Sequence, residues 1–181
     1  DDDDDDEDPE DVAENRQGHC HADDEQASPP GFEVEEGEAG GQQGDDRSDD
    51  GGQSWRSIEQ GLPSTFGFPA AAHPRDAATL FLLPLNGDQA GRFMPEGKAA
   101  VWRTRDGGES WQALREGLPQ QNAFLTVLRQ AMAVDRLEPA GVYFGTHTGA
   151  LYASTDEGDS WACIAPYLPP ICSIETLVVS S

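Results

Sequence analysis

The sequence predicts an all-β chain, a partial β-propeller behind an acidic N-terminal segment, and three observations support this prediction. One motif occurs three times, as RSDDGGQSWRSIEQGLP at 47–63, RTRDGGESWQALREGLP at 103–119 and ASTDEGDSWACIAPYLP at 153–169. The copies begin 56 and 50 residues apart, a period typical of propellers and solenoids. Short apolar segments bounded by turn residues separate the copies, as expected of β-strands.

Each copy of the motif predicts a rigid turn between two strands. The shared positions are a hydroxyl residue, an aspartate, a glycine, a serine and a tryptophan: Ser48, Asp50, Gly52, Ser54, Trp55, Thr104, Asp106, Gly108, Ser110, Trp111, Ser154, Asp156, Gly158, Ser160 and Trp161. An aspartate in a tight turn accepts hydrogen bonds from backbone N–H groups, and glycine adopts positive φ without steric cost. Tryptophan buries a large ring. We therefore expect a structural role for these residues.

Each complete repeat is expected to contain four short strands. FPAAAHP, TLFLLPL, AAVWRTR and SWQAL supply them within residues 66–115, and LTVLRQAMAV, GVYFGTH, ALYAST and SWACIA within 122–165. Four antiparallel strands per repeat of this length describe a propeller blade. A hairpin at 45–63 ends a preceding blade, and ICSIETLVV at 171–179 is expected to be a closing strand. NAFLTVLRQAMAV could also form a helix, but the matching place in the first repeat contains prolines, which favours a strand.

The acidity of the chain is confined to its first part. Residues 1–50 have a net charge of -20 out of -24 for the whole chain. Clustered carboxylates repel one another and offer little apolar surface to bury, so a disordered low-complexity segment is expected over 1–44. The sequence GHCH at 18–21 contains two histidines and a cysteine but has no second ligand pair. We therefore expect neither a metal site nor a cofactor.

The remaining composition limits partners and location. A chain this acidic is not expected to bind nucleic acid through phosphates, and no apolar run reaches membrane-spanning length. Three cysteines without framework spacing favour a reducing compartment, and no signal-peptide pattern opens the chain, so a cytoplasmic location is expected. Unpaired sheet edges predict self-association or a protein partner.

The motif resembles the BNR or Asp-box repeat, S/T-x-D-x-G-x-S/T-W, at every defined position of all three copies. The phrases EGLPSTFGFP and AGVYFGTHTGALYAS are similar to the C-terminal part of bacterial WD40/YVTN/BNR-like proteins, often labelled exo-alpha-sialidase or glycosyl hydrolase. This resemblance covers about residues 45–181 and implies a β-propeller. It does not by itself imply an enzyme, because Asp-boxes also occur in sortilin-type receptors and photosystem assembly factors.

The resemblance to sialidases implies three arginines, a tyrosine nucleophile with a glutamate, an aspartate acid/base and an Arg-x-Pro motif near the first blade. That motif is missing here, and no pair of carboxyl groups is fixed across one bond. We therefore predict no catalytic residue and a fragment of a sialidase-like propeller that serves as a binding or structural scaffold. The alternative is a glycoside hydrolase whose active site needs blades missing from this chain.

Three residues are candidates to face a ligand: Phe66, Phe68 and Arg129. They are expected near the central opening, at the start or within an inner strand, and would contact a glycan only in an intact propeller. The alternative for the two phenylalanines is that they wedge adjacent blades together. Tyr143 alternates like an ordinary strand residue, and both Tyr143 and Tyr152 are interpreted as blade packing.

Overall fold

The computed structural model describes residues 45–87 and 91–179, so the acidic segment 1–44 and the GHCH sequence lie outside it. Within the described ranges the chain is all-β, as predicted, and its strands form three antiparallel sheets. One short 3-10 turn, η2 (Pro95–Gly97), precedes the fifth strand. No helix in these ranges is long and apolar enough to cross a membrane.

The strands follow one another in space in the order of the chain. The first hairpin pairs β1 (Asp46–Arg47) with β2 (Arg56–Ser57). The middle sheet has the order β3 (Phe66–Ala72), β4 (Leu80–Leu85), β5 (Val101–Thr104), β6 (Gln112–Leu114). The last sheet runs from β7 (Met132–Val134) through β8 (Val142–Gly145) and β9 (Leu151–Ser154) to β10 (Ala162–Ala165).

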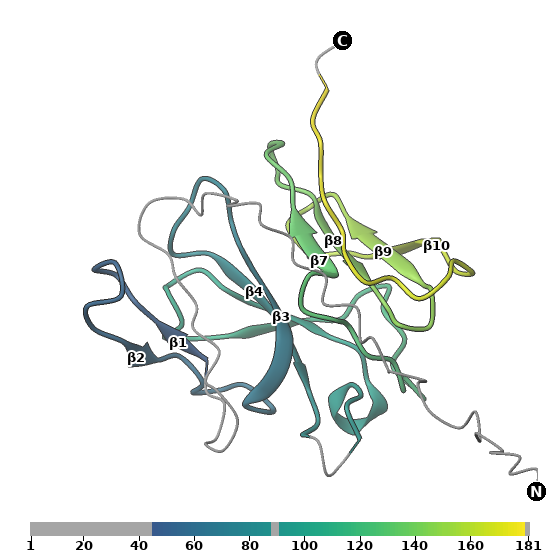
Figure 1. Cartoon of the computed structure of the whole chain (residues 1–181), viewed down its shortest axis with the longest axis horizontal. Helices are drawn as coiled ribbons and strands as arrows, with labels where there is room; N and C mark the ends of the chain where they lie inside the picture. Colours follow the sequence, from purple (N-terminus) through teal and green to yellow (C-terminus); the bar gives the residue numbers. More distant parts are fainter. Residues whose placement is uncertain (1–44, 88–90, 180–181) are drawn as a thin grey trace, which may run out of the picture.

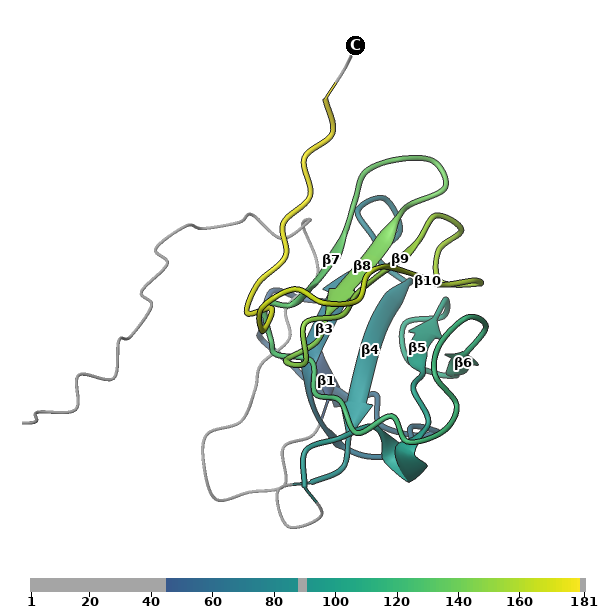
Figure 2. The same cartoon turned by 90° about the vertical axis from the view of Figure 1, so that its right-hand side faces the viewer.

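The three sheets are arranged side by side. Figure 1 shows the first hairpin, the middle sheet and the last sheet in succession across the molecule, and Figure 2 shows β3 to β6 next to one another. The first strands of the two larger sheets, β3 and β7, lie next to each other. The turns β1–β2, β5–β6 and β9–β10 therefore lie on the opposite, outer side of their sheets.

The core lies between these sheets. Phe81, Leu83 and Val101 of the middle sheet pack against Val142 and Phe144 of the last sheet, and all five side chains are buried. A second cluster joins the other face of the middle sheet to the first hairpin, and its buried members are Ile58, Leu80 and Leu82. Strand β4 is buried at every position because both of its faces are covered, which explains its unbroken apolar run.

Two strand predictions are wrong. Of the strand expected over 125–134, only Met132–Val134 forms, and Arg129 lies in the turn before it. The preceding segment buries alternate side chains, Ala123, Leu125 and Val127, as a strand would. Its backbone bonds to loops instead: the Ala123 N–H donates to the Gly97 carbonyl. The segment is therefore extended, but its bonds go to a loop and not to a strand.

Residues 171–179, expected as a closing strand, also form no strand. The N–H of Ile171 donates to the Thr146 carbonyl, and that of Ile174 donates to the Gln130 carbonyl. The segment therefore runs beside β7 with isolated hydrogen bonds rather than a ladder. A strand needs a regular ladder of backbone hydrogen bonds with its neighbour, and in the described ranges the last sheet ends at β7.

Candidate functional site

The three motif turns have the same hydrogen-bond network. In the middle sheet, the Thr104 hydroxyl donates to Asp106 Oδ1 at 2.7 Å and accepts the Gly108 N–H at 2.9 Å. The same aspartate accepts the Ser110 N–H at 2.9 Å and the Ser110 hydroxyl at 2.6 Å. Each bond recurs between equivalent atoms in the first hairpin and the last sheet. The aspartates are thus fully engaged within their own turns.

This network lowers the pKa of each aspartate. The Ser54 hydroxyl and backbone N–H stabilise the charged form of Asp50, and the Ser110 and Thr104 hydroxyls do so for Asp106. Burial works to raise the pKa of Asp156, but the hydrogen bonds from Ser154 and Ser160 outweigh it. A carboxyl held in the charged form is a poor proton donor near neutral pH. The geometry therefore suits a structural role for these aspartates rather than acid/base catalysis.

The second and third motif turns also contact the preceding sheet. A Cβ on Gly108 would lie 2.4 Å from Ile58 Cγ2, and one on Gly158 would lie 2.6 Å from Leu114 Cδ1. In both cases an aliphatic side chain three residues after the motif tryptophan occupies the space above the next turn's glycine. An arginine of the preceding unit then binds a turn carbonyl: Arg56 Nη2 bonds to Gly107 O and Arg103 Nη1 to Glu157 O, both at 2.7 Å. The turns therefore set the spacing between sheets.

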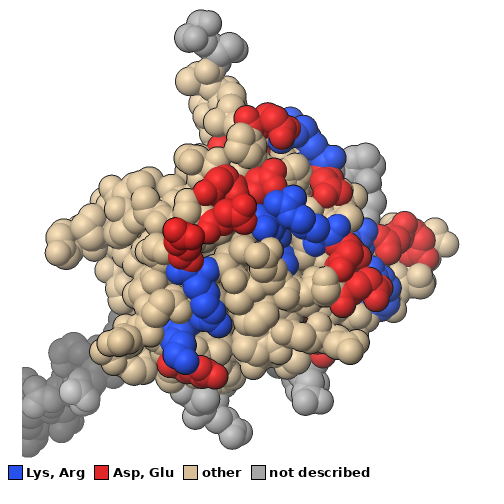
Figure 3. All heavy atoms as spheres, turned by 180° about the vertical axis from the view of Figure 1, so that it is seen from behind, with Lys and Arg blue, Asp and Glu red and all other residues tan. Residues whose placement is uncertain are grey.

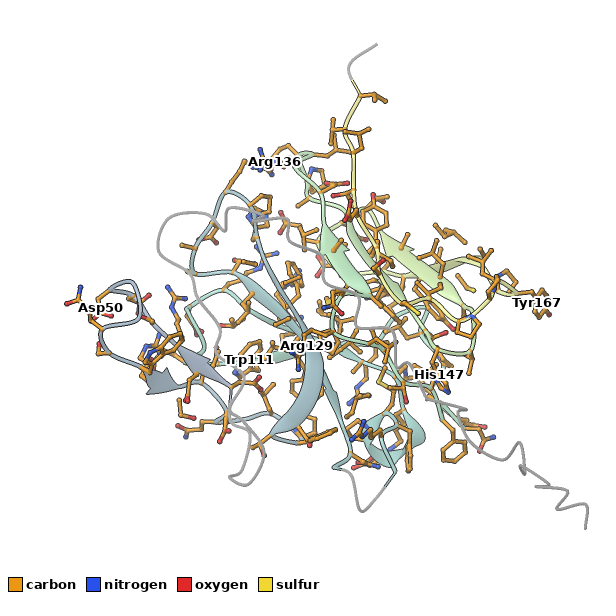
Figure 4. The ribbon with its side chains drawn as sticks, viewed as in Figure 1. Asp50, Trp111, Arg129, Arg136, His147 and Tyr167 are labelled. Carbon is orange, nitrogen blue, oxygen red and sulfur yellow. The ribbon has the colours of Figure 1, made fainter. Side chains whose placement is uncertain are left out.

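The candidate ligand residues lie at the inner side of the sheets. Phe66 begins β3 and is half-buried, with the Arg92 guanidinium 5.8 Å from its ring centroid. Phe68 lies in the same strand, but its side chain is outside the described structure. Arg129 is exposed in the turn before β7, and Figure 4 shows it where the two larger sheets meet, far from Asp50 at the outer edge.

A loop contributes residues that the sequence analysis missed. The Thr126 hydroxyl donates to the Arg92 carbonyl, and the Thr126 N–H donates to His147 Nδ1 at 2.9 Å. The exposed Phe124 ring packs edge-on against Phe93 at 5.1 Å. Aromatic rings, an arginine and a histidine thus gather near the start of β3. The sequence held no signal for this cluster, because residues 92 and 126 come together only through folding.

Tyr143 does not have the properties of a nucleophile. Its hydroxyl donates to Asp135 Oδ2 at 2.9 Å, and burial followed by this bond raises its pKa. Asp135 also accepts the N–H groups of Leu137 and Gly141, which closes the turn between β7 and β8. Tyr152 stacks on Phe144 with ring centroids 4.9 Å apart. Both tyrosines therefore pack and brace the last sheet.

A groove lies on the far face of the last sheet, away from the middle sheet. Its volume is about 620 Å³, and Leu137, Tyr143 and Leu151 line one side of it. The C-terminal segment, residues 173–179, lines the other side. In the part of the chain that is described, no cluster of three or more His, Cys, Asp or Glu side chains could hold a metal ion.

Comparison with known proteins supports the fold. No protein-family model and no curated protein sequence matches the chain. A solved structure, the GH74 xyloglucanase from Xanthomonas campestris, superposes with a TM-score of 0.51 at 22% sequence identity over 73% of this chain. The match spans 18% of that enzyme's chain. At this identity the likeness shows the fold alone: an all-β arrangement consistent with part of a glycoside hydrolase propeller.

Proposed function

We propose that the chain is part of a sialidase-like Asp-box β-propeller and serves as a binding or structural scaffold, without catalytic activity of its own. The observation that supports this proposal most directly is the turn network repeated in three units. Its carboxylates are bonded within their own turns. The turns contact the neighbouring sheet through their glycines and a backbone carbonyl. The two four-stranded sheets are then blades, and the first hairpin is the outer half of another.

The inner side of the sheets supports binding rather than chemistry. Phe66 and Arg129 supply an aromatic face and a cation, which suit the apolar face and the acidic group of a sugar acid. A glycosidase also needs two carboxyl groups facing one bond. The carboxylate of Asp135, which follows β7, is occupied by two backbone N–H groups and the Tyr143 hydroxyl.

The alternative is a glycoside hydrolase whose active site needs further blades. The likeness to a glycoside hydrolase propeller favours it, because the matched part of that enzyme is a small share of its chain. In such a protein Phe66, Phe68 and Arg129, the residues that the sequence predicts to face a ligand, would contribute to one wall of a glycan site. The other wall, including the paired carboxylates, would come from the remaining blades.

A turnover assay tests whether this chain has catalytic activity of its own. The full chain is incubated with a fluorogenic sialoside and, separately, with xyloglucan, and released product is measured against buffer. We expect no product above background with either substrate. Turnover that disappears in an Arg129→Ala variant, with an unchanged melting temperature, would overturn the proposal of a scaffold without catalytic activity.

A further inference from the structure

The two larger sheets have equivalent faces, which strand register identifies. Phe81 pairs with Arg103 in the middle sheet, and Tyr143 pairs with Ala153 in the last sheet. Val101 is the first residue of β5 and Leu151 the first residue of β9, which are the third strands of their sheets. Phe81 and Val101 of the middle sheet thus correspond to Tyr143 and Leu151 of the last sheet. These residues define the far face of each sheet, the one directed toward the next unit.

The far face is covered in one sheet and open in the other. In the middle sheet, Phe81, Val101 and Leu114 are 0%, 0% and 4% exposed, because the last sheet lies over them. In the last sheet, Tyr143 and Leu151 are only half-buried. Ile164, which follows Trp161 by three residues as Leu114 follows Trp111, is 57% exposed.

The outer half of this open face is apolar. Ile164 and the exposed Tyr167 and Leu168 lie in and after β10. Figure 3 shows the corresponding side of the molecule, on its left, as a surface without charged side chains. The inner half is occupied by the C-terminal segment, whose Ile174 N–H bonds to the Gln130 carbonyl just before β7. The uncovered outer half of the face therefore has the extent that the outer two strands of a further unit would cover.

The first hairpin is such a pair of outer strands. Its turn has the same network as the two turns that dock on a preceding sheet, and Gly52 takes the place of Gly108 and Gly158 with φ of 81°. Gly51 stands where Glu157 stands in the last turn. In the middle sheet, His73 and Arg103 face Glu157, whereas the last sheet has Asp135 and Ala153 at those positions. A turn without an acidic side chain there avoids repulsion by Asp135.

We propose that the far face of the last sheet binds the first hairpin of a second copy of this chain, with Ile164 seated above Gly52. The contact repeats the one between Ile58 and Gly108 inside the chain. It is heterologous, so each copy offers one hairpin and one face, and successive copies form rings or filaments. It lacks the arginine that binds a turn carbonyl in each internal contact, because Ala162 stands in place of Arg56 and Ala153 in place of Arg103, so the association is reversible.

Sedimentation velocity of the full chain tests this contact, over about 1 to 100 μM, the range of a weak reversible interface. We expect the weight-average mass to rise with concentration. It should also rise with NaCl, because a net charge of -24 keeps copies apart at low salt. An Ile164→Asp variant should bind at least about tenfold more weakly, since it buries a charge. A Phe124→Asp variant is the matched control: Phe124 is 61% exposed and packs on Phe93, off this face.

A mixing experiment tests the polarity of the contact. Ile164→Asp blocks the face, and Gly52→Ala places a methyl group where Ile164 would sit. Each variant alone should self-associate much more weakly than the wild-type chain, whereas a mixture should form a one-to-one complex with the wild-type affinity, because one intact hairpin and one intact face remain. A wild-type chain that is monomeric throughout, equal weakening by Phe124→Asp, or no complex in the mixture each overturns the proposal. The last result would indicate symmetric pairing of sheet edges.

Discussion

At the scale of single residues, hydrogen bonds within each turn determine how carboxylates behave. The motif aspartates accept bonds from groups no more than four residues away, so their low pKa is a local property. Asp45 is the opposite case: burial, with repulsion from Glu59 and Asp46, raises its pKa to about 6. Its environment depends on the packing of the first hairpin.

The turn network predicts the effect of removing one aspartate. Asp106→Ala leaves the Ser110 N–H and two hydroxyls without their acceptor, so we expect the melting temperature to fall by several degrees. Glu109→Ala in the same turn removes only an exposed ion pair with Arg56 and should change it by about 1 °C or less. Differential scanning calorimetry of both variants measures this, and equal shifts would contradict a structural role for Asp106.

The raised pKa of Asp45 predicts that the stability of the fold depends on pH. Because its pKa of about 6 in the folded chain exceeds the value of 3.8 for a free carboxyl, the folded state holds the proton more tightly. The free energy of unfolding should therefore rise as pH falls from 7 through 6 toward 4. Asp45→Asn should stabilise the chain at pH 7 by roughly 1–3 kcal/mol and flatten this rise.

Below this range the motif aspartates reverse the trend. The pKa values of Asp50, Asp106 and Asp156 are lowered, so their contribution is present above pH 4 and is lost as they become protonated. Stability should thus be greatest between about pH 4 and 6. Urea titrations at several pH values measure the profile, and an Asp45→Asn variant with the wild-type profile would refute the assignment to Asp45.

At the scale of elements, residues at equivalent positions of the motif lie in different surroundings. Gly61 and Gly117 both precede the Leu-Pro that closes a motif, and both have positive φ, 97° and 82°. A Cβ on Gly61 would meet nothing within 4 Å, whereas one on Gly117 would lie 1.9 Å from the Trp161 carbonyl oxygen. The difference arises because the last sheet closes tightly on the middle sheet at Gly117.

This pair makes a matched experiment. Gly61→Ala should cost about 1 kcal/mol, the strain of a side chain at positive φ. Gly117→Ala adds a clash with backbone that cannot rotate away and should cost roughly 3 kcal/mol or more. Chemical denaturation gives both values. Similar costs at the two sites would mean that the sheets are not in contact at Gly117.

At the scale of the whole molecule, one core joins the two larger sheets. Phe81 of the middle sheet and Phe144 of the last sheet are both fully buried in the same cluster. The two sheets cannot separate without exposing this cluster to water. We therefore expect them to unfold together.

Truncation of either ring tests this coupling. Phe81→Ala and Phe144→Ala should each cost about 3–5 kcal/mol and keep a single unfolding transition followed by circular dichroism and by tryptophan fluorescence. Leu177→Ala is the control, because that side chain is 85% exposed, and it should have no measurable effect. Two separate transitions in either variant would show that the sheets are independent units.

Local sequence specifies the all-β class, the number of strands in each larger sheet and the position of each turn. These features rest on bonds and alternation within a few residues, so each copy of the motif specifies its own turn whatever surrounds it. The expected strands at 125–131 and 171–179 fail to form for a tertiary reason, because a strand also needs a regular hydrogen-bond ladder with a partner strand. Tertiary structure also decided that Leu114 is buried and Ile164 exposed, since burial depends on the unit that lies next to each sheet.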